Sequence, residues 1–253
     1  MDLKLQGKNI LVTGGTRGIG AATVEAFLEE GANVAFCARN ADQVDACVTK
    51  HMNKHVGHVM GTVVDVRDTQ SYLGWIDNVA DEFDGIDGFV ANVSGGAEPG
   101  LKGWSNAFDV DLMATVQGCD KVLSYLAESE QGSIVVVSSI SAVESFGGPS
   151  AYATIKAGLI AYASQLADAA APHGVRVNTV SPGPIDVHDG YWGTVKAQNP
   201  DQYKMVADRH GAKRLGTTRE VANAIAFLTS PAASWVTGTN LIVDGGYTKR
   251  VQF

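Results

Sequence analysis

Residues 8–40, KNILVTGGTRGIGAATVEAFLEEGANVAFCARN, decide the fold of this 253-residue chain. An apolar run at 10–13 is followed by a glycine-rich loop, and a helix is expected over 19–30, ended by Gly31. A second apolar run follows at 33–38. Glycines between a strand and a helix let a pyrophosphate approach the main-chain N–H groups at the helix N-terminus. The stretch, with its spacing G-x-x-x-G-x-G, therefore predicts a dinucleotide-binding βαβ unit.

The rest of the chain repeats this alternation of apolar runs and helical segments. Near-continuous apolar runs such as SIVVVS are typical of parallel strands that are buried on both faces. No linker or short-period repeat interrupts the pattern. It predicts one α/β domain over 1–253, a Rossmann fold with a doubly wound parallel sheet of about seven strands. The strands are expected near 8–13, 33–38, 58–64, 87–92, 133–138, 175–180 and 240–243.

Composition excludes several classes of protein. The net charge of −8 argues against a general nucleic-acid binder, which needs a basic surface. No stretch approaches eighteen uninterrupted apolar residues, and no charged-then-apolar leader opens the chain. The three cysteines are scattered, which fits a reducing compartment better than a disulfide framework. We expect a soluble, cytoplasmic protein without a nucleic-acid or membrane partner.

Tyr152 and Lys156 lie four residues apart in AYATIKAGL. On a helix this spacing places phenol and ammonium on one face, with Cβ atoms about 5–6 Å apart. The cation favours phenolate over phenol, which lets a tyrosine act as a general acid or base near neutral pH. An isolated pair of this kind also occurs by chance on ordinary surface helices. It gains its weight here from the glycine-rich stretch at the other end of the chain.

Five motifs together resemble the short-chain dehydrogenase/reductase family, in its order and at its spacings, from Leu5 to about Tyr247. The family implies an oxidoreductase that interconverts a ketone and a secondary alcohol, without a metal. It also implies a homotetramer built by pairing helices, here expected at 104–127 and 151–172. The motifs are TGGTRGIG at 13–20, Ser139, YATIK at 152–156, NTVSPGPI at 178–185 and LIVDGG at 241–246.

The resemblance also implies catalytic roles. Ser139 and Tyr152 would bond the substrate carbonyl oxygen, Tyr152 would give its proton to the developing alkoxide, and Lys156 would hold the nicotinamide ribose. An alternative is a regulatory or sensing protein that binds NADPH on the same fold with little turnover, although such proteins tend to lose the tyrosine or the lysine. A structural or interaction protein would need neither the glycine loop nor phosphate-binding arginines.

The choice of coenzyme rests on the end of the second strand. An NAD-dependent enzyme usually places an acid there for the ribose 2′-OH, whereas this chain has Ala38 followed by Arg39. Arg17 lies in the glycine loop, and two guanidinium groups suit a 2′-phosphate, so NADP(H) is expected. By resemblance, the cofactor-binding residues are Gly14, Thr16, Arg17, Gly18, Ile19, Gly20, Arg39, Asp65, Val66, Asn92, Tyr152, Lys156, Pro182, Gly183 and Ile185.

Within that set, Asp65 is expected to face the adenine amino group and Val66 to form an apolar wall. Two departures from the family pattern lie near the nicotinamide. After Asn92 the chain has Val-Ser-Gly-Gly, so a wider turn is expected and Ser94 would face cofactor or substrate. Where the family commonly has a threonine, this chain has Val187, so one hydroxyl contact to the cofactor is expected to be missing.

Asp111 is the most consequential departure. It stands where the family has a catalytic asparagine on a helix that bends to hold a water near the lysine. An aspartate is of similar size, so the water could persist, but it brings a negative charge toward Lys156. Asp111 is therefore either a proton relay in the catalytic set or a structural replacement, and the sequence leaves both open.

The substrate is the least determined part of the prediction. A substrate lid is expected over about 186–212, where His188, Tyr191, Trp192 and Tyr203 supply polar and aromatic groups; the alternative is a flap packed on the protein. A sugar, a cyclic ketone, a steroid and a 3-oxoacyl thioester all remain open, with a small or medium polar ketone favoured. The expected substrate-binding residues are Ser94, Ser139, Glu144, Tyr152 and Trp192, with Phe146 as a further candidate.

Three histidines in KHMNKHVGH suggest a metal cluster, with His51 and His55 one turn apart on an expected helix and His58 close behind. Hydride transfer of this kind needs no metal, and the segment is polar and rich in lysine. A solvated helix face is therefore expected instead.

Overall fold

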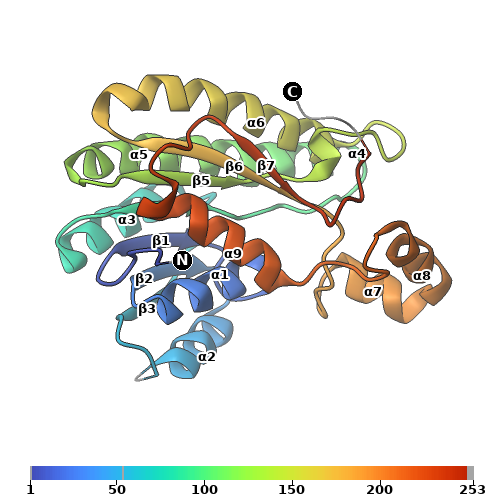
Figure 1. Ribbon diagram of the computed structural model, residues 1–253, viewed down its shortest axis with the longest axis horizontal. Helices are drawn as coiled ribbons and strands as arrows, with labels where there is room; N and C mark the ends of the chain where they lie inside the picture. Colours follow the sequence, from blue (N-terminus) through green and yellow to red (C-terminus); the bar gives the residue numbers. More distant parts are fainter. Residues whose placement is uncertain (1, 53, 250–253) are drawn as a thin grey trace.

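A computed structural model of the chain describes residues 2–52 and 54–249. Its centre is a sheet of seven strands, all paired in parallel, in the order β3-β2-β1-β4-β5-β6-β7 (Figure 1). This confirms the predicted Rossmann fold and its doubly wound sheet. The strands are β1 (Asn9–Thr13), β2 (Asn33–Ala38), β3 (Val59–Val63), β4 (Gly88–Ala91), β5 (Ser133–Val137), β6 (Arg176–Pro182) and β7 (Asn240–Val243).

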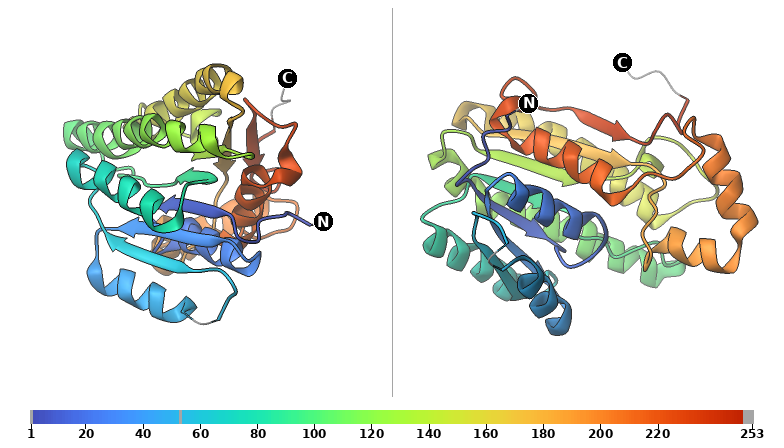
Figure 2. Two further views of the ribbon diagram at one scale, coloured as in Figure 1. Left: turned by 90° about the vertical axis from the view of Figure 1, so that its left-hand side faces the viewer. Right: turned by 60° about the horizontal axis from the view of Figure 1, so that its bottom comes forward.

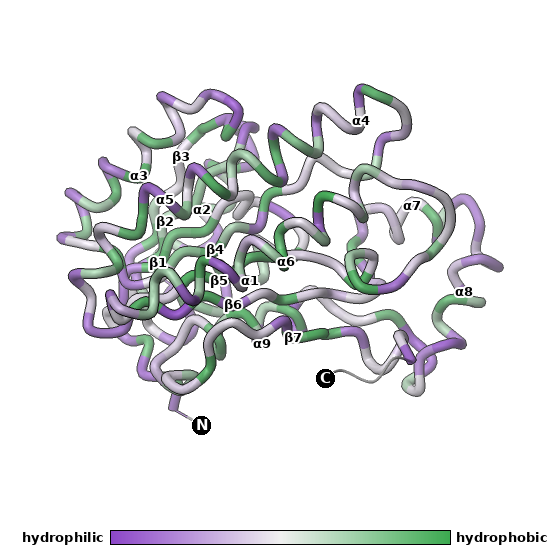
Figure 3. Tube along the Cα trace, turned by 90° about the horizontal axis from the view of Figure 1, so that it is seen from above, coloured by the Kyte–Doolittle hydropathy of each residue, from purple (hydrophilic) through white to green (hydrophobic). Residues whose placement is uncertain are grey.

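Helices cover both faces of the sheet, and each face has its own apolar core (Figures 1 and 2). Strand side chains alternate between the cores, so that Leu11 joins one and its neighbours Ile10 and Val12 join the other. Along the tube in Figure 3, apolar residues concentrate on these interior strands. One face carries α3 (Thr69–Phe83), α5 (Ala114–Glu128) and α6 (Ala151–Ala170), and the other carries α1 (Gly18–Glu29), α2 (Ala41–His51) and α9 (Thr218–Thr229).

The glycine-rich loop joins β1 to α1 as a compact turn. Gly14 has a φ of +71°, a conformation that residues with a Cβ rarely adopt. A Cβ on Gly20 would lie 2.0 Å from the carbonyl oxygen of Gly14, so no larger residue fits where the helix crosses the loop. The N-terminus of α1 therefore comes close to the end of β1, as the sequence predicted.

The helix expected over 104–127 is interrupted. It begins as α4 (Gly100–Asn106), continues as a π-helical segment, η1 (Ala107–Met113), and resumes as α5. Inside η1 the carbonyl oxygen of Asp111 accepts a hydrogen bond from the Thr115 hydroxyl at 2.7 Å. The bend that the family resemblance implied is therefore present, as a π-helix.

The segment 186–212 lies at one end of the sheet and carries two helices, α7 (Tyr191–Gln198) and α8 (Pro200–Arg209), which stand beyond the carboxyl ends of the strands (Figure 1). Strand β6 runs two residues further than predicted, because Ser181 and Pro182 still pair with β7. Short 3-10 turns complete the fold: η2 (Ile140–Ala142), η3 (Ala171–His173) and η4 (Pro231–Ala233). Among the helices described, none combines the length and apolarity needed to cross a membrane.

The expectation of a solvated histidine face was wrong for His51. Helix α2 ends at His51, so His55 lies beyond the helix, and the two rings meet with Nδ1 of His51 3.4 Å from Nε2 of His55. This contact, at the point where the chain leaves the helix, covers the His51 side chain, which is buried, whereas His58 is exposed. Burial lowers the pKa of His51, and the nearby Lys50 lowers it further. No group of three or more candidate metal ligands is found within 2–52 and 54–249.

Candidate active site

Two cavities open side by side at the carboxyl ends of the strands, where ligands bind in open α/β sheets. The glycine-loop cavity, of about 810 Å³, runs from the β1–α1 loop past the ends of β2 and β4. The tyrosine cavity, of about 850 Å³, is bounded by η2, the start of α6, the end of β6 and the 186–212 segment. The two share several wall residues, which makes them one continuous site: Ile19, Asn92, Ser94, Gly96, Val187, Gly190 and Tyr191.

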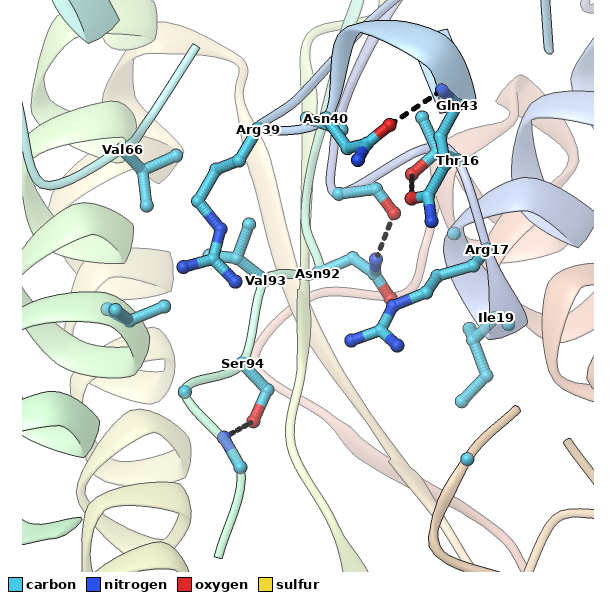
Figure 4. Close-up of a pocket in the computed structure, with 18 of the residues that line it drawn as sticks. Thr16, Arg17, Ile19, Arg39, Asn40, Gln43, Val66, Asn92, Val93 and Ser94 are labelled. Atoms are coloured by element: carbon cyan, nitrogen blue, oxygen red, sulfur yellow. Dashed lines mark hydrogen bonds between the residues drawn. The ribbon is translucent and has the colours of Figure 1, made fainter. Parts of the chain in front are cut away.

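Two arginines reach into the glycine-loop cavity. Arg17, from the loop itself, and Arg39, from the end of β2, extend their guanidinium groups into the same space (Figure 4). Arg17 makes a loose ion pair with Asp189 at 3.9 Å, while Arg39 makes no hydrogen bond or ion pair with any residue the structure describes. Thr16 also lines this cavity, and its hydroxyl lies 3.3 Å from Oε1 of Gln43. Both cations are thus available to an anionic ligand.

Asp65 and Val66 line the same cavity, beyond the end of β3. The Asp65 carboxylate is held by Arg67, whose backbone N–H and Nε both donate to Oδ1 at 3.0 Å. This side-chain hydrogen bonding, together with the arginine's charge, holds the pKa of Asp65 below its usual range despite partial burial. The residue expected to face the adenine is therefore already paired with an arginine.

Asn92 lies at the end of β4, where the two cavities meet. Its side-chain amide donates to the carbonyl oxygens of Thr13 and Gly14, at 3.0 and 3.3 Å (Figure 4). The Asn92 amide therefore connects the end of β4 to the glycine-rich loop. The sequence predicted Asn92 as a cofactor contact, and the structure gives it this supporting contact in addition to a place in the wall.

Ser139, Tyr152 and Lys156 meet in the tyrosine cavity. Ser139 follows β5, and its hydroxyl accepts a hydrogen bond from the Ser141 backbone N–H at 3.1 Å. Tyr152 and Lys156 share one face of α6, with the ammonium nitrogen 5.9 Å from the centre of the phenol ring. The phenol hydroxyl makes no hydrogen bond to any described residue, and it is free for a ligand in the cavity. The spacing argument made from sequence placed Tyr152 and Lys156 on one helix face, and the fold adds Ser139, which was assigned by resemblance, to the same cavity.

The ammonium group of Lys156 is deeply buried, with 3 % of the side chain exposed. It donates to the carbonyl oxygen of Val137 at 2.9 Å and lies 3.0 Å from Oδ1 of Asp111, in an ion pair without hydrogen-bond geometry at that oxygen. At this distance no water fits between the two groups. The Asp111 carboxylate therefore contacts Lys156 directly.

Asp111 also fixes the loop after β4. Its Oδ2 accepts a hydrogen bond from the Gly95 backbone N–H at 2.6 Å, and Asn106 donates its side-chain amide to the Gly95 carbonyl oxygen at 2.7 Å. A Cβ on Gly95 would lie 2.7 Å from that same amide and 2.9 Å from the backbone carbonyl oxygen of Asn106, so a larger residue would displace the loop or the helix. Ser94 precedes it and lines both cavities. The Asp111 carboxylate thus links the loop after β4, which forms part of the cavity wall, to Lys156.

The end of β6 supplies one further wall. Pro182, Gly183 and Ile185 line the tyrosine cavity, and Ile185 forms a β-bridge to Gly216. Val187, where a threonine was expected, lines both cavities and packs in the apolar core, so this position offers a methyl surface and no hydroxyl.

The aromatic residues predicted for the 186–212 segment divide into two groups. Tyr191 and Trp192 line the tyrosine cavity, whereas His188 and Tyr203 line neither cavity. The Tyr203 hydroxyl instead donates to the carboxylate of Asp186 at 2.8 Å. Two other predicted candidates, Glu144 and Phe146, line the tyrosine cavity beside η2.

Sequence reasoning missed Gln202 and Tyr247, which also line the tyrosine cavity. The Tyr247 ring reaches this cavity because it packs 4.8 Å from the ring of His210. An aromatic residue directly after the LIVDGG motif was the available signal.

Comparisons with known proteins agree with this geometry. A family model described as Enoyl-(Acyl carrier protein) reductase matches residues 14–248. An isoepoxydon dehydrogenase of Penicillium expansum is 37 % identical over 253 residues, covering 98 % of each chain, and a 3-oxoacyl-[acyl-carrier-protein] reductase of Vibrio cholerae is 33 % identical over 96 % of this chain and 98 % of its own length.

Among solved structures, the L-sorbose reductase of Gluconobacter frateurii, complexed with NADPH and L-sorbose, superposes with a TM-score of 0.91. It is 28 % identical, and the match covers 99 % of this chain and all of the other. With the sheet order, the glycine loop and the Ser139, Tyr152 and Lys156 cluster, these matches lead to one conclusion. The chain belongs to the short-chain dehydrogenase/reductase family, and it is an oxidoreductase that interconverts ketones and alcohols.

Proposed function

We propose that the protein is an NADP(H)-dependent oxidoreductase that interconverts a ketone and a secondary alcohol, with Tyr152 as the general acid and base. One observation carries the proposal: the Tyr152 hydroxyl lies in a cavity without a hydrogen-bond partner among the described residues, near the buried Lys156 ammonium and beside the glycine-loop cavity. A bound ketone could therefore accept a hydrogen bond from Tyr152 while its carbonyl carbon faces the nicotinamide side.

The residues of the site fit NADP(H). Gly20, in the first turn of α1, packs so closely on Gly14 that a Cβ would lie 2.0 Å from the Gly14 carbonyl oxygen, and both glycines line the glycine-loop cavity at the N-terminus of the helix. Arg17 and Arg39 offer two guanidinium groups where a 2′-phosphate would lie. The L-sorbose reductase complex contains NADPH, which supports the same choice of coenzyme.

In the reaction, the coenzyme supplies or accepts the hydride. Ser139 and Tyr152 orient the substrate oxygen, and Tyr152 delivers its proton to that oxygen as it becomes an alcohol. Lys156, at 5.9 Å from the Tyr152 ring, stabilises the phenolate that is left. The Asp111 carboxylate keeps the Lys156 ammonium group in its position, 3.0 Å away, and so acts on Tyr152 through the lysine. We propose the 186–212 segment as the substrate lid, with Trp192 among the substrate contacts.

The first test replaces Tyr152 by phenylalanine. The variant loses the proton donor and keeps the ring, so turnover of a ketone panel with NADPH should fall by about 10²- to 10⁴-fold while NADPH binding is retained. Tyr162→Phe is the matched control, because Tyr162 lies on the same helix but lines neither cavity. Absorbance of NADPH gives the rate, and retained turnover in Tyr152→Phe would refute the assignment.

The second test addresses the coenzyme. If Arg39 binds the 2′-phosphate, Arg39→Ala should raise the KM for NADPH by about 10- to 100-fold, the range of a charge-assisted hydrogen bond, and leave the KM for NADH nearly unchanged. Lys102→Ala, a surface substitution outside both cavities, serves as the control. Equal effects on both coenzymes would exclude a phosphate-binding role.

One observation favours a second candidate function. The Lys156 ammonium is already neutralised by Asp111, and this favours an NADPH-binding regulatory or sensing protein with little turnover. The two candidates differ in the NADPH absorbance assay: a sensing protein would bind the coenzyme with Tyr152 intact and still reduce none of the ketones, sugars or acyl thioesters in the panel.

We also propose a homotetramer in the cytoplasm. Leu101, Trp104 and Phe108 expose apolar side chains along α4 and η1, within the helical region expected to pair between subunits, and this supports the assembly. The three free cysteines are all buried, which supports a reducing compartment. Light scattering coupled to size exclusion gives the oligomeric state, and a monomer at micromolar concentration would contradict the tetramer.

A further inference from the structure

Three polar groups that line the tyrosine cavity have donors or acceptors without a hydrogen-bond partner among the described residues. The carboxylate of Glu144, partly buried after η2, makes no hydrogen bond or ion pair within residues 2–52 and 54–249. The Gln202 side chain uses Oε1 to accept from Asn199 at 3.2 Å, which leaves its amide N–H groups unpaired. The Tyr247 hydroxyl also has no partner among the described residues, although only 5 % of this residue is exposed.

The positions of two of these groups are fixed by packing. The ring of Tyr247 lies 4.8 Å from the ring of His210 and 5.8 Å from that of Phe146, and the Arg209 guanidinium lies 4.3 Å from its centre. Asn199 holds the amide of Gln202 at the start of α8. Groups that are held in place before a ligand arrives lose little entropy on binding, so they favour a specific contact.

The donor and acceptor pattern of the three groups selects a ligand chemistry. Glu144 can only accept as a carboxylate, the Gln202 amide N–H groups can only donate, and Tyr247 can do both. A hydroxyl group also donates and accepts, so neighbouring hydroxyls can satisfy all three. An ammonium group could serve only the acceptors, and a substrate carboxylate or phosphate would be repelled by Glu144.

We propose that Glu144, Gln202 and Tyr247 form a subsite for substrate hydroxyl groups, and that the substrate is a neutral ketone with vicinal hydroxyls, reduced to the corresponding polyol. This inference rests on the proposed ketone reduction, since it names the substrate class of the same site. It also disfavours the steroid and the acyl thioester among the classes left open by the sequence, because both would leave these polar groups unpaired.

The test compares matched ketones that differ only in their hydroxyls: xylulose with 2-pentanone, and 3,4-dihydroxycyclohexanone with cyclohexanone. The full chain with NADPH should prefer at least one hydroxylated member over its partner in kcat/KM by about 10-fold or more. Glu144→Ala should lower kcat/KM for that hydroxylated ketone by about 10- to 100-fold, the range of a hydrogen bond to a charged group, and change the deoxy partner less than about threefold. Glu144→Gln should fall between, and Tyr247→Phe should lose about 2- to 10-fold.

Glu128→Ala is the matched control, because Glu128 is exposed at the far end of α5 and lines neither cavity. A second measurement does not depend on turnover: xylitol and cyclohexane-1,2,4-triol, the reduced forms of the two hydroxylated ketones, are titrated calorimetrically into the protein–NADPH complex of the natural chain and of Glu144→Ala. Weaker polyol binding in the variant supports the subsite even if no ketone is reduced, an outcome that would refute only the proposed function. Equal reduction of hydroxylated and deoxy ketones, or polyol binding unaffected by both Glu144→Ala and Tyr247→Phe, would overturn the inference.

Discussion

Two lysine–aspartate pairs, one that reaches the tyrosine cavity through Lys156 and one within the 186–212 segment, differ mainly in burial. At the tyrosine cavity, Lys156 lies 3.0 Å from Asp111, with 3 % and 1 % of the two side chains exposed. In the 186–212 segment, Lys196 lies 2.8 Å from Asp186, with 54 % and 33 % exposed. The distances are nearly equal, so distance alone would rank the two pairs alike.

Burial changes what each pair contributes. Two ions removed from water depend on each other, and the loss of one leaves the other as an uncompensated buried charge. Exposed ions are solvated with or without a partner, so their pair adds little. The Lys156–Asp111 pair is thus part of the structural core of the site, whereas the Lys196–Asp186 pair joins the start of the proposed lid to α7 within the same segment.

The largest effect is expected from Asp111→Ala. The variant leaves the Lys156 ammonium with only the Val137 carbonyl oxygen and also frees the Gly95 N–H, so the free energy of unfolding should fall by about 3–5 kcal/mol. Turnover should be lost with it. Denaturant unfolding of the coenzyme-free protein gives the first quantity, and NADPH absorbance the second.

Asp109→Ala is the matched control for this change. Asp109 lies on the same π-helical segment and is exposed, and its one side-chain hydrogen bond with a described residue comes from the Ser105 hydroxyl, so its removal should cost no more than about 0.5 kcal/mol. If Asp111→Ala destabilises the protein no more than Asp109→Ala, the buried Lys156–Asp111 pair does not stabilise the site, and the importance given to its burial is wrong.

A smaller effect is expected from Asp186→Asn. Its carboxylate accepts from Lys196 and from the Tyr203 hydroxyl, both at 2.8 Å, and the variant should lose no more than about 1 kcal/mol of stability at neutral pH. Because the lid would close less well, the substrate KM should rise a few-fold with kcat nearly unchanged.

The same pair gives a pH dependence with a defined sign. The hydrogen bond from Lys196 holds the pKa of Asp186 below its ordinary value of 3.8, assisted by Tyr203 and opposed by partial burial. Its contribution to stability is therefore present above pH 3.8 and disappears as the pH falls through the lowered pKa. The stability difference between the natural chain and Asp186→Asn should shrink between pH 5 and the acid limit of folding; a difference that grows would contradict this reading.

Local rules were sufficient for the frame of the site. The glycine spacing located the β1–α1 turn, apolar runs located all seven strands, and i,i+4 spacing brought the Tyr152 phenol to Lys156. Each of these depends on residues near one another in the chain, where backbone geometry fixes the outcome.

The features that sequence did not predict depend on side-chain contacts, some local and some between distant segments, that the alternation of strands and helices does not fix. Tyr247 reaches the tyrosine cavity because it packs on His210, about forty residues earlier in the chain, and Asp65 is occupied because Arg67 folds back onto it. The burial of His51 depends on how the chain turns after α2. The sequence indicated that Asp111 brings a negative charge toward Lys156, but the direct contact depends on how closely two helices approach, which the sequence does not give.

The π-helical segment Ala107–Met113 has a consequence for how this region tolerates change in chain length. A π-turn accommodates one residue more than an α-turn, and each residue rotates a helix by about 100°. Deleting a single residue there would let the helix run on regularly, yet it would swing Asn106 and everything before it to another side and release the Gly95 loop. The additional residue of the π-helix therefore sets the register between α4 and α5. The wall of the site depends on the number of residues in this segment as much as on their identity.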